Sequence, residues 1–224
     1  MSVERVLEPE VMDSVAEAVA YDAMDHGAVN SQFVGDFLAA CPPPSRAILD
    51  VGTGTARIPI LLCQKIPDAS VVAIDLSEQM LSLAEKNVAA AGLSSRIQSE
   101  KSDAKQLPFP DDAFEVVISN SIAHHIPRPQ QVMAEAVRVT RSGGHLFWRD
   151  LVRPGSHRQI DDLVERYAGN EDASQQKLFA DSLRAALTLE EVGDIVRDLG
   201  FDRSSVRLTS DRHWTWSAVK HEDI

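Results

Sequence analysis

A glycine-rich turn between an apolar run and an apolar helix pattern carries the clearest chemical signal in this 224-residue sequence. Asp50 stands at the end of the run, and Gly52, Thr53 and Gly54 follow it directly. Glycine has no Cβ, so a backbone rich in it can approach a ligand closely. In an open α/β sheet such a turn lies at the carboxyl end of the first strand, where nucleotide-type cofactors bind.

The spacing after Gly52 excludes two common nucleotide motifs. The dinucleotide fingerprint needs a third glycine at the position of Arg57. A Walker A loop needs Gly-Lys where Arg57 and Ile58 stand. The remaining pattern is D-x-G-x-G-x-A, from Asp50 to Ala56.

Further segments extend this pattern in a fixed order along the chain. They are Val71–Asp75 with the helix start Leu76–Met80, then Lys101–Ala104, Leu107–Asp111 with Val116–Asn120, and Arg141–Gly144 as a turn into His145–Trp148. Together with the glycine turn, this ordered set resembles the class I S-adenosylmethionine (SAM) methyltransferases, in particular their quinone-methyltransferase-like small-molecule branch. The resemblance covers roughly residues 46 to 150.

The resemblance implies SAM as cofactor, with S-adenosylhomocysteine as product. Asp75 ends the second apolar run, and its carboxylate can accept hydrogen bonds from both ribose hydroxyls. Asp103 would bind the adenine amino group. The implied cofactor-binding residues are Asp50, Gly52, Thr53, Gly54, Asp75, Leu76, Met80, Asp103, Ala104, Asn120 and Tyr21.

The acceptor end of the site is less clearly marked. Methyl transfer from a sulfonium is an in-line displacement, and a base is needed only if the acceptor atom carries a proton of high pKa. His124 and His26 are the candidates for a catalytic role, since His124 follows the fourth apolar run and His26 lies in a segment that resembles the helix closing over SAM. A histidine bonded to a backbone group is the alternative for His124 and His125.

Three residues are candidates for contacting the acceptor: His125, Arg153 and Trp214. Arg153 could hold an anionic acceptor by a two-nitrogen contact, or be a solvated loop arginine. Trp214 could form an aromatic wall, or pack under a helix together with Trp216. The seven histidines are scattered, so we expect no metal site.

The order of apolar segments predicts an α/β fold, a Rossmann-like three-layer αβα sandwich with a mostly parallel seven-stranded sheet. Strand and helix patterns alternate to about residue 151. Ser205–Thr209 and His213–Val219 are separated by three residues and should pair antiparallel, so the last strand is antiparallel. We expect a single domain over residues 1–224.

Two helical additions flank this core. Residues 9–40 should form an N-terminal cap of two helices, the first with an apolar stripe of Val11, Val15, Ala18 and Val19. Residues 153–187 should add two helices after the fifth strand, separated at Gly169-Asn170. We expect this insert to cover the acceptor pocket together with the helix that carries Tyr21. The alternative is a homodimer interface of Leu178, Phe179 and Leu183.

Composition limits the partners. The chain has 22 basic and 34 acidic residues, a net charge of −12, which disfavours nucleic acids and anionic membranes. It has no apolar run of membrane-spanning length, no signal-peptide pattern, and two cysteines without metal-type spacing, so we expect a cytoplasmic protein. The sequence therefore predicts methylation of a small molecule. The alternatives are a non-catalytic SAM-binding or regulatory protein, and a SAM-fold enzyme that uses a modified SAM.

Overall fold

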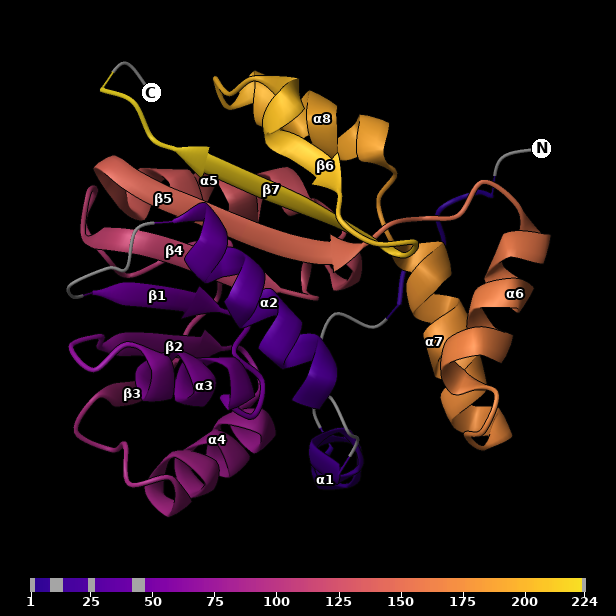
Figure 1. Cartoon of the computed structure of the whole chain (residues 1–224), viewed down its shortest axis with the longest axis horizontal. Helices are drawn as coiled ribbons and strands as arrows, with labels where there is room; N and C mark the ends of the chain where they lie inside the picture. The colour runs from indigo at the N-terminus through magenta and orange to yellow at the C-terminus, as the bar shows by residue number, and fades with distance from the viewer. Residues whose placement is uncertain (1–2, 9–13, 24–26, 42–46, 223–224) are drawn as a thin grey trace. The chain divides into compact units, whose positions relative to one another are not determined.

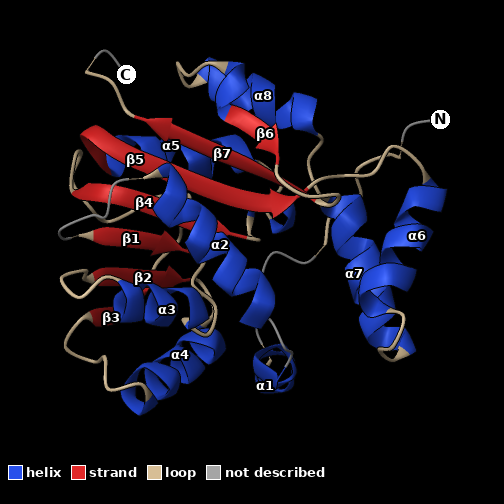
Figure 2. Cartoon of the chain, viewed as in Figure 1, coloured by secondary structure: helices blue, strands red, loops and turns tan. Residues whose placement is uncertain are grey.

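A seven-stranded sheet forms the centre of the computed structural model, which describes residues 3–8, 14–23, 27–41 and 47–222 (Figures 1 and 2). The strand order is β3-β2-β1-β4-β5-β7-β6. The pairs β1–β2, β2–β3 and β1–β4 are parallel and β6–β7 is antiparallel, which confirms the predicted sheet. The strands are β1 Ile48–Val51, β2 Val71–Asp75, β3 Ile97–Lys101, β4 Phe114–Asn120, β5 Thr140–Leu151, β6 Val206–Leu208 and β7 His213–Val219.

Helices alternate with the strands as the sequence predicts. Figure 1 shows α2 across one face of β1 and β4, with α5 on the opposite face. The helices are α1 Val15–Ala23, α2 Gly27–Ala40, α3 Arg57–Lys65, α4 Glu78–Ala90, α5 Pro129–Val139, α6 His157–Ala168, α7 Ala173–Ala185 and α8 Leu189–Asp198, with short 3₁₀ turns η1 Ala123–His125 and η2 Arg203–Ser205.

The chain divides into two compact units. The glycine-loop unit comprises Val11–Asn120, Gln130–Trp148 and Ser217–Ile224. The histidine unit comprises Met1–Glu10, Ser121–Pro129 and Arg149–Trp216, so β5 and β7 contribute residues to both units. The expectation of a single domain stays a prediction.

The core of the glycine-loop unit joins α2 to the sheet through three aromatic rings. Phe33 and Phe37 lie one helical turn apart and meet Phe147 of β5 edge to face, at centroid distances of 5.2 and 5.6 Å. All three rings are buried. Edge-to-face pairs of this kind add about 0.5–1.5 kcal/mol beyond the area that they bury.

The apolar stripe predicted for the first helix is only partly buried. Ala18 is buried, whereas the side chains of Val15 and Val19 are 62% and 51% exposed. The prediction of a buried stripe that includes Val15 and Val19 was therefore wrong. Val11 lies outside the described residues.

The turn predicted at Arg141–Gly144 is instead part of the long strand β5. Gly143 has φ +74°, a conformation that glycine adopts at little cost. Its N–H donates to the carbonyl of Lys220 at 2.7 Å, and the N–H of Lys220 donates to Gly144 at 2.9 Å. Hydrogen bonds to the segment after β7 thus hold the glycines in the sheet.

The two insert helices, α6 and α7, pack against each other and against the N-terminal segment. Their shared core consists of Val3, Leu151, Ile160, Leu163, Leu183 and Ala186. Leu183 is fully buried and Leu178 is 42% exposed, so the dimer surface predicted on α7 does not include Leu183. A capping box of Thr188 and Glu191 begins the next helix, α8.

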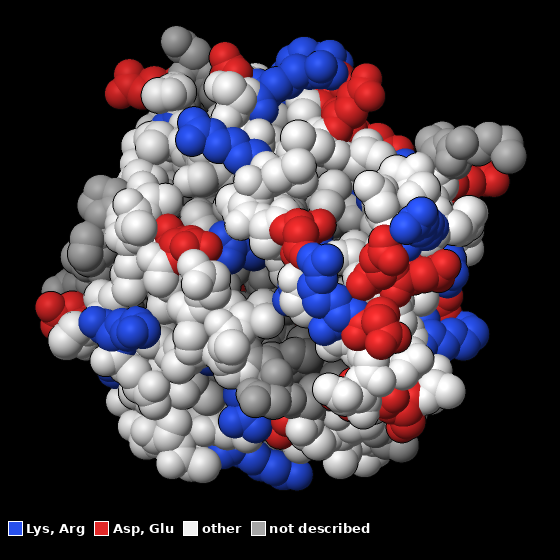
Figure 3. All heavy atoms as spheres, turned by 45° about the vertical axis from the view of Figure 1, so that its right-hand side comes forward, with Lys and Arg blue, Asp and Glu red and all other residues white. Residues whose placement is uncertain are grey.

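Acidic and basic side chains are interspersed on the face drawn in Figure 3, and no continuous basic surface appears on it. Within α7, for example, Asp181 pairs with both Lys177 and Arg184. In the part of the chain that the structure describes, no helix is both long enough and apolar enough to cross a membrane.

Candidate functional site

The glycine loop after β1 is bent by two residues with left-handed backbone, Gly52 at φ +74° and Gly54 at φ +56°. The N–H groups of Gly52 and Thr53 both donate to the carbonyl of Ile74 in β2, each at 2.9 Å. The loop is thus attached to the neighbouring strand and leads into α3 through Ala56, which also has positive φ.

Asp75 links this loop to the start of α4. Its Oδ2 accepts from the N–H of Gly54 at 2.8 Å, and its Oδ1 accepts from the N–H of Ser77 at 2.9 Å. Each carboxylate oxygen has a second lone pair, so Asp75 can accept two further hydrogen bonds from a ligand. Burial raises the pKa of Asp75, although the backbone donors oppose the shift.

Asp50 and Tyr21 are two titratable groups beside the glycine loop. Asp50 is 2% exposed; burial raises its pKa to about 7, the Thr53 side chain opposes the shift, and the charge of Asp75 adds to it. A Cβ placed on Gly54 would lie 3.7 Å from Cε1 of Tyr21, so the Tyr21 ring lies next to the loop. Burial, followed by the nearby carboxylates, raises the pKa of the Tyr21 phenol. Such a site favours a ligand with positive charge.

Asp22 fastens the helix that carries Tyr21. Its carboxylate accepts from Nε and Nη2 of Arg57 at 3.1 and 3.0 Å and from Asn87 at 3.1 Å. Asn87 also donates to the carbonyl of Thr55 at 3.0 Å. Thus α1, α3, α4 and the glycine loop meet in one polar network.

The other predicted cofactor residues lie at the carboxyl ends of the neighbouring strands. The N–H of Ser102 donates to the carbonyl of Asp75 at 3.1 Å, which places the segment after β3 beside the end of β2. Asp103 is half-buried and accepts from the backbone N–H of Lys105 at 2.9 Å. Leu76, Ala104 and Asn120 are half-buried, and Met80 is buried in α4.

Similarity to known proteins decides the family. Residues 49–148 match the methyltransferase-domain family model. The chain is 30% identical over 182 residues to the ubiquinone/menaquinone biosynthesis C-methyltransferase UbiE of Dinoroseobacter shibae, and the match covers 77% of this chain and 72% of that one. The chain belongs to the class I SAM-dependent methyltransferases.

Other methyltransferases agree with this assignment. The chain is 29% identical over 181 residues to the 27-O-demethylrifamycin SV methyltransferase of Amycolatopsis mediterranei, covering 79% of this chain and 62% of that one. The fold matches a candidate SAM-dependent methyltransferase of Methanococcus maripaludis, with a TM-score of 0.70, 18% identity and coverage of 97% and 98%. It also matches the plantazolicin methyltransferase BamL, solved with a substrate analogue and S-adenosylhomocysteine, with a TM-score of 0.67, 17% identity and coverage of 86% and 69%.

The glycine-loop unit of this methyltransferase fits SAM chemically. SAM carries a cationic sulfonium, an ammonium group and a ribose with two hydroxyls, and it supplies the methyl group. Asp50, Asp75 and Asp22 provide the negative charge around Tyr21, and Asp75 has lone pairs for hydroxyl donors. We expect these residues and the glycine loop to hold the cofactor.

In the histidine unit, His124 and Asp150 form a buried ion pair. Nδ1 of His124 lies 2.5 Å from Oδ1 of Asp150, and the backbone N–H of His124 donates to Oδ2 at 3.2 Å. Burial alone would lower the pKa of His124, but the charge and hydrogen bond of Asp150 outweigh it, so that pKa is raised. The same pairing lowers the pKa of Asp150 against the opposite effect of burial. Asp150 thus fixes the orientation of the His124 ring.

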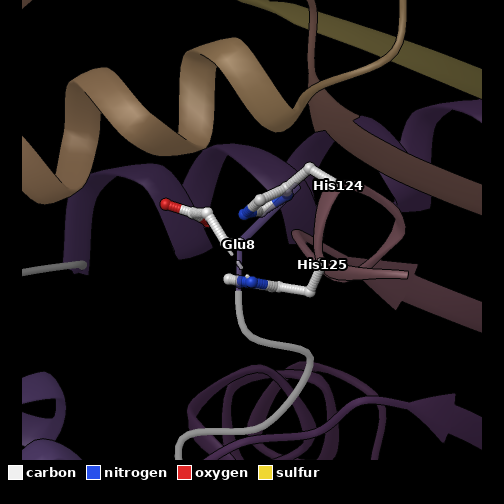
Figure 4. A group of neighbouring side chains, drawn as sticks. All are labelled: Glu8, His124 and His125. Atoms are coloured by element: carbon white, nitrogen blue, oxygen red, sulfur yellow. Dashed lines mark ion pairs between the residues drawn. The ribbon is translucent and has the colours of Figure 1, made fainter. Parts of the chain in front are cut away.

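The pKa of His125 is shifted in the opposite direction to that of His124. Its ring lies against His124, with centroids 4.0 Å apart, and its Nδ1 lies 3.4 Å from Oε2 of Glu8 (Figure 4). Burial and repulsion from His124 lower its pKa to about 3, so the ring is neutral at physiological pH. Among the described residues, no hydrogen bond of good geometry reaches this buried Nδ1.

Arg5 holds the turn that carries both histidines. Its Nη2 donates to the carbonyls of Ala123, His124 and Ile126 at 3.4, 3.4 and 3.1 Å, and its Nε donates to Ala185 at 2.7 Å. Sequence reasoning missed the roles of Arg5 and Glu8, as it missed those of Asp22, Arg57 and Asn87. Their partners lie 32 to 180 positions away in the chain, so no local pattern could have identified them.

The remaining predicted residues are placed as follows. Arg153 donates from Nη1 to Ala186 at 2.9 Å and from Nη2 to Glu191 at 2.6 Å, so both ends of its guanidinium already have partners. Trp214 is fully buried. The roles of Arg153, Trp214 and His125 in contacting the acceptor stay predictions. His26 lies outside the described residues.

Proposed function

We propose that this enzyme transfers the methyl group of SAM to a small-molecule acceptor by in-line displacement. One observation carries the proposal: the similarity to the quinone methyltransferase extends well beyond residues 49–148, over 77% of the chain. The rifamycin methyltransferase, which by its name also acts on a small molecule, matches over a similar share. The net charge of −12 supports a substrate without a phosphate backbone.

This chain's own residues would contribute binding and alignment rather than acid–base chemistry. Asp75 and the glycine loop would position the cofactor, and Tyr21 on α1 would cover it. Alignment of reacting atoms and exclusion of water lower the barrier of a displacement that needs no proton transfer when the acceptor atom is already nucleophilic. The catalytic role of His124 or His26 stays a prediction.

A second candidate function is a SAM-fold protein without methyl transfer. The fold also matches the [4+2]-cyclase SpnF, with a TM-score of 0.57, 17% identity and coverage of 87% and 80%. The fold alone therefore does not determine the reaction. The carboxylates of the glycine-loop unit would bind SAM equally well in a regulatory protein or in an enzyme that uses a modified SAM.

An assay of methyl transfer distinguishes the methyltransferase from the non-catalytic SAM-binding protein. Purified protein is incubated with methyl-labelled SAM and a small-molecule fraction of cell extract or a panel of quinols and phenols. We expect release of S-adenosylhomocysteine and a labelled product heavier than its acceptor by one CH₂ group. Asp75→Asn should lower both when SAM is limiting. Tight SAM binding without product across such panels would favour the non-catalytic alternative.

A further inference from the structure

Glu8 meets His124 and His125 in the histidine unit although it lies more than 100 positions before them in the chain. Their ligand-type atoms all lie within 4.8 Å of one another. Figure 4 shows both imidazole rings extending toward the side chain of Glu8. We propose that these three residues bind a divalent transition-metal ion of the zinc type. The proposal is independent of the methyl acceptor and reverses our expectation that no metal site exists.

The separation of the donor atoms suits such an ion. Bonds of 2.0–2.2 Å from a tetrahedral ion would place its ligand atoms roughly 3.3–3.6 Å apart. Nδ1 of His125 and Oε2 of Glu8 are 3.4 Å apart. The ligand atom of His124 lies within 4.8 Å of those of Glu8 and His125, so a bound ion would draw it closer.

The first indication of a bound ion comes from the hydrogen bonding of His125. Its Nδ1 is buried and has no hydrogen bond of good geometry within the described residues, although it lies close to Glu8. A buried polar atom without a partner is costly, so it calls for an explanation. A metal ion between Nδ1 and the carboxylate would satisfy both groups.

The second indication is the support behind the other two donors. Metal-binding histidines usually pair their second ring nitrogen with a carboxylate, which fixes the ring. Asp150 makes this contact with Nδ1 of His124 at 2.5 Å and leaves Nε2 as the donor. The hydroxyl of Ser182 lies 3.2 Å from each oxygen of Glu8 and restrains the carboxylate.

Arg5 pre-organises the three donors. It lies three residues before Glu8 and donates to the carbonyls of the turn that carries both histidines. The N–H of Val6 also donates to the carbonyl of Arg184 at 3.2 Å, and Val3 is buried in the α6–α7 core. The N-terminal segment is therefore attached at several points just before Glu8.

The donor set selects the class of ion. Two imidazoles and one carboxylate are ligands for zinc, cobalt, nickel or iron(II), whereas magnesium and calcium prefer oxygen ligands. Three protein ligands leave a fourth position open to water or a ligand oxygen. On this assignment His124 is a metal ligand rather than a residue that orients or deprotonates the acceptor.

Cobalt(II) is the direct probe, because its visible absorption reports tetrahedral coordination by nitrogen and oxygen. Full-length protein without a histidine tag is titrated with Co²⁺, and Zn²⁺ is then added to displace it, in the presence of excess Mg²⁺. We expect one equivalent of Co²⁺ to bind, Zn²⁺ to displace it and Mg²⁺ not to compete. Glu8→Gln and His125→Gln should each weaken Co²⁺ binding at least tenfold.

His157→Gln is the matched control, because His157 is an exposed histidine at the start of α6. It should leave Co²⁺ binding unchanged. Asp150→Asn keeps the site ligands and should weaken binding about 10- to 100-fold, as loss of a supporting carboxylate does. Circular dichroism and S-adenosylhomocysteine binding confirm that each variant is folded.

Equal Co²⁺ affinity in the wild type, Glu8→Gln and His125→Gln would overturn the proposal, as would the absence of a tetrahedral spectrum. Weakening by His157→Gln alone would assign the binding to surface histidines and also overturn it. Failure of methyl transfer would not affect this test, since metal binding is read by absorption and not by activity.

Discussion

Arg57 binds Asp22 with two nitrogens, Nε 3.1 Å from Oδ1 and Nη2 3.0 Å from Oδ2, and so joins α3 to α1. Arg57 stands where the dinucleotide fingerprint would have its third glycine. The residue that rules out that motif therefore anchors the helix that carries Tyr21 beside the glycine loop.

Loss of this pair should weaken cofactor binding modestly. Arg57 is about half exposed, with 49% of its side chain accessible, and such pairs contribute about 0.2–1 kcal/mol. We expect Arg57→Gln and Asp22→Asn each to lower the affinity for S-adenosylhomocysteine about two- to fivefold in calorimetry. Arg197→Gln, which removes an exposed ion pair of α8, is the control. Unchanged affinity in both variants would show that α1 does not need this anchor.

Asp75→Asn should weaken cofactor binding more than the loss of the Arg57–Asp22 pair. An amide would set its NH₂ group against the backbone N–H of Gly54 or Ser77, which now donate to the two carboxylate oxygens. It would also lose an acceptor for the ribose. Loss of a charge-assisted hydrogen bond costs about 1.5–3 kcal/mol, which is about tenfold or more in affinity. Calorimetric titration tests this, with the exposed Asp68→Asn as control; wild-type affinity in a folded Asp75→Asn protein would disprove the ribose assignment.

Gly54→Val should abolish SAM binding, and Gly54→Ala should lower stability. Gly54 has φ +56°, where a residue with a Cβ costs about 1–2 kcal/mol. The added side chain would also point toward Tyr21. Gly35→Ala in α2 is the matched control: it meets no atom within 4 Å and should stabilise by about 0.5–1 kcal/mol. Chemical denaturation and circular dichroism measure stability, and a folded Gly54→Val protein with normal affinity would contradict the placement.

The pH dependence of folding stability should reflect the titration of Asp50. Its pKa is raised to about 7, whereas an unfolded aspartate has a pKa of about 3.9. The ionised form is thus disfavoured by folding, so this residue's contribution to stability is greatest below about pH 4 and falls as the pH rises to about 7. We expect Asp50→Asn to flatten the decline in melting temperature of the ligand-free protein over this range. The same slope in wild type and variant would contradict it.

Cofactor affinity should change with pH in the opposite direction. A cationic ligand favours the ionised form of Asp50, so SAM binding should strengthen as the pH rises toward about 7 and then level off. Calorimetry at a series of pH values measures this, and Asp50→Asn should remove most of the dependence. Affinity that strengthens on acidification would place the positive groups of SAM away from Asp50.

Leu183→Ala should destabilise the protein by about 2–5 kcal/mol, because this side chain is fully buried between α6, α7 and the N-terminal segment. Leu178→Ala, on the same helix but 42% exposed, should change stability by less than about 0.5 kcal/mol. Light scattering with both variants tests the homodimer alternative, since a dimer through α7 would dissociate in Leu178→Ala.

Much of the fold was predictable because its signals are local. The apolar runs of β1, β2 and β4 and the short connection between β6 and β7 each occupy a few neighbouring residues. The glycine loop was also predictable from local signals, because its two positive-φ positions are occupied by glycine.

The sequence by itself therefore determined the sheet, the glycine loop and the family of cofactor. Only the tertiary structure decided that Glu8 and Arg5 meet the histidine turn, that Asp150 holds His124, and that Val15 and Val19 face solvent. The physical reason is that a side chain's partner, and so its burial and charge state, depends on which distant segments the fold brings together. Local spacing records a residue's own backbone conformation but not the identity of that partner.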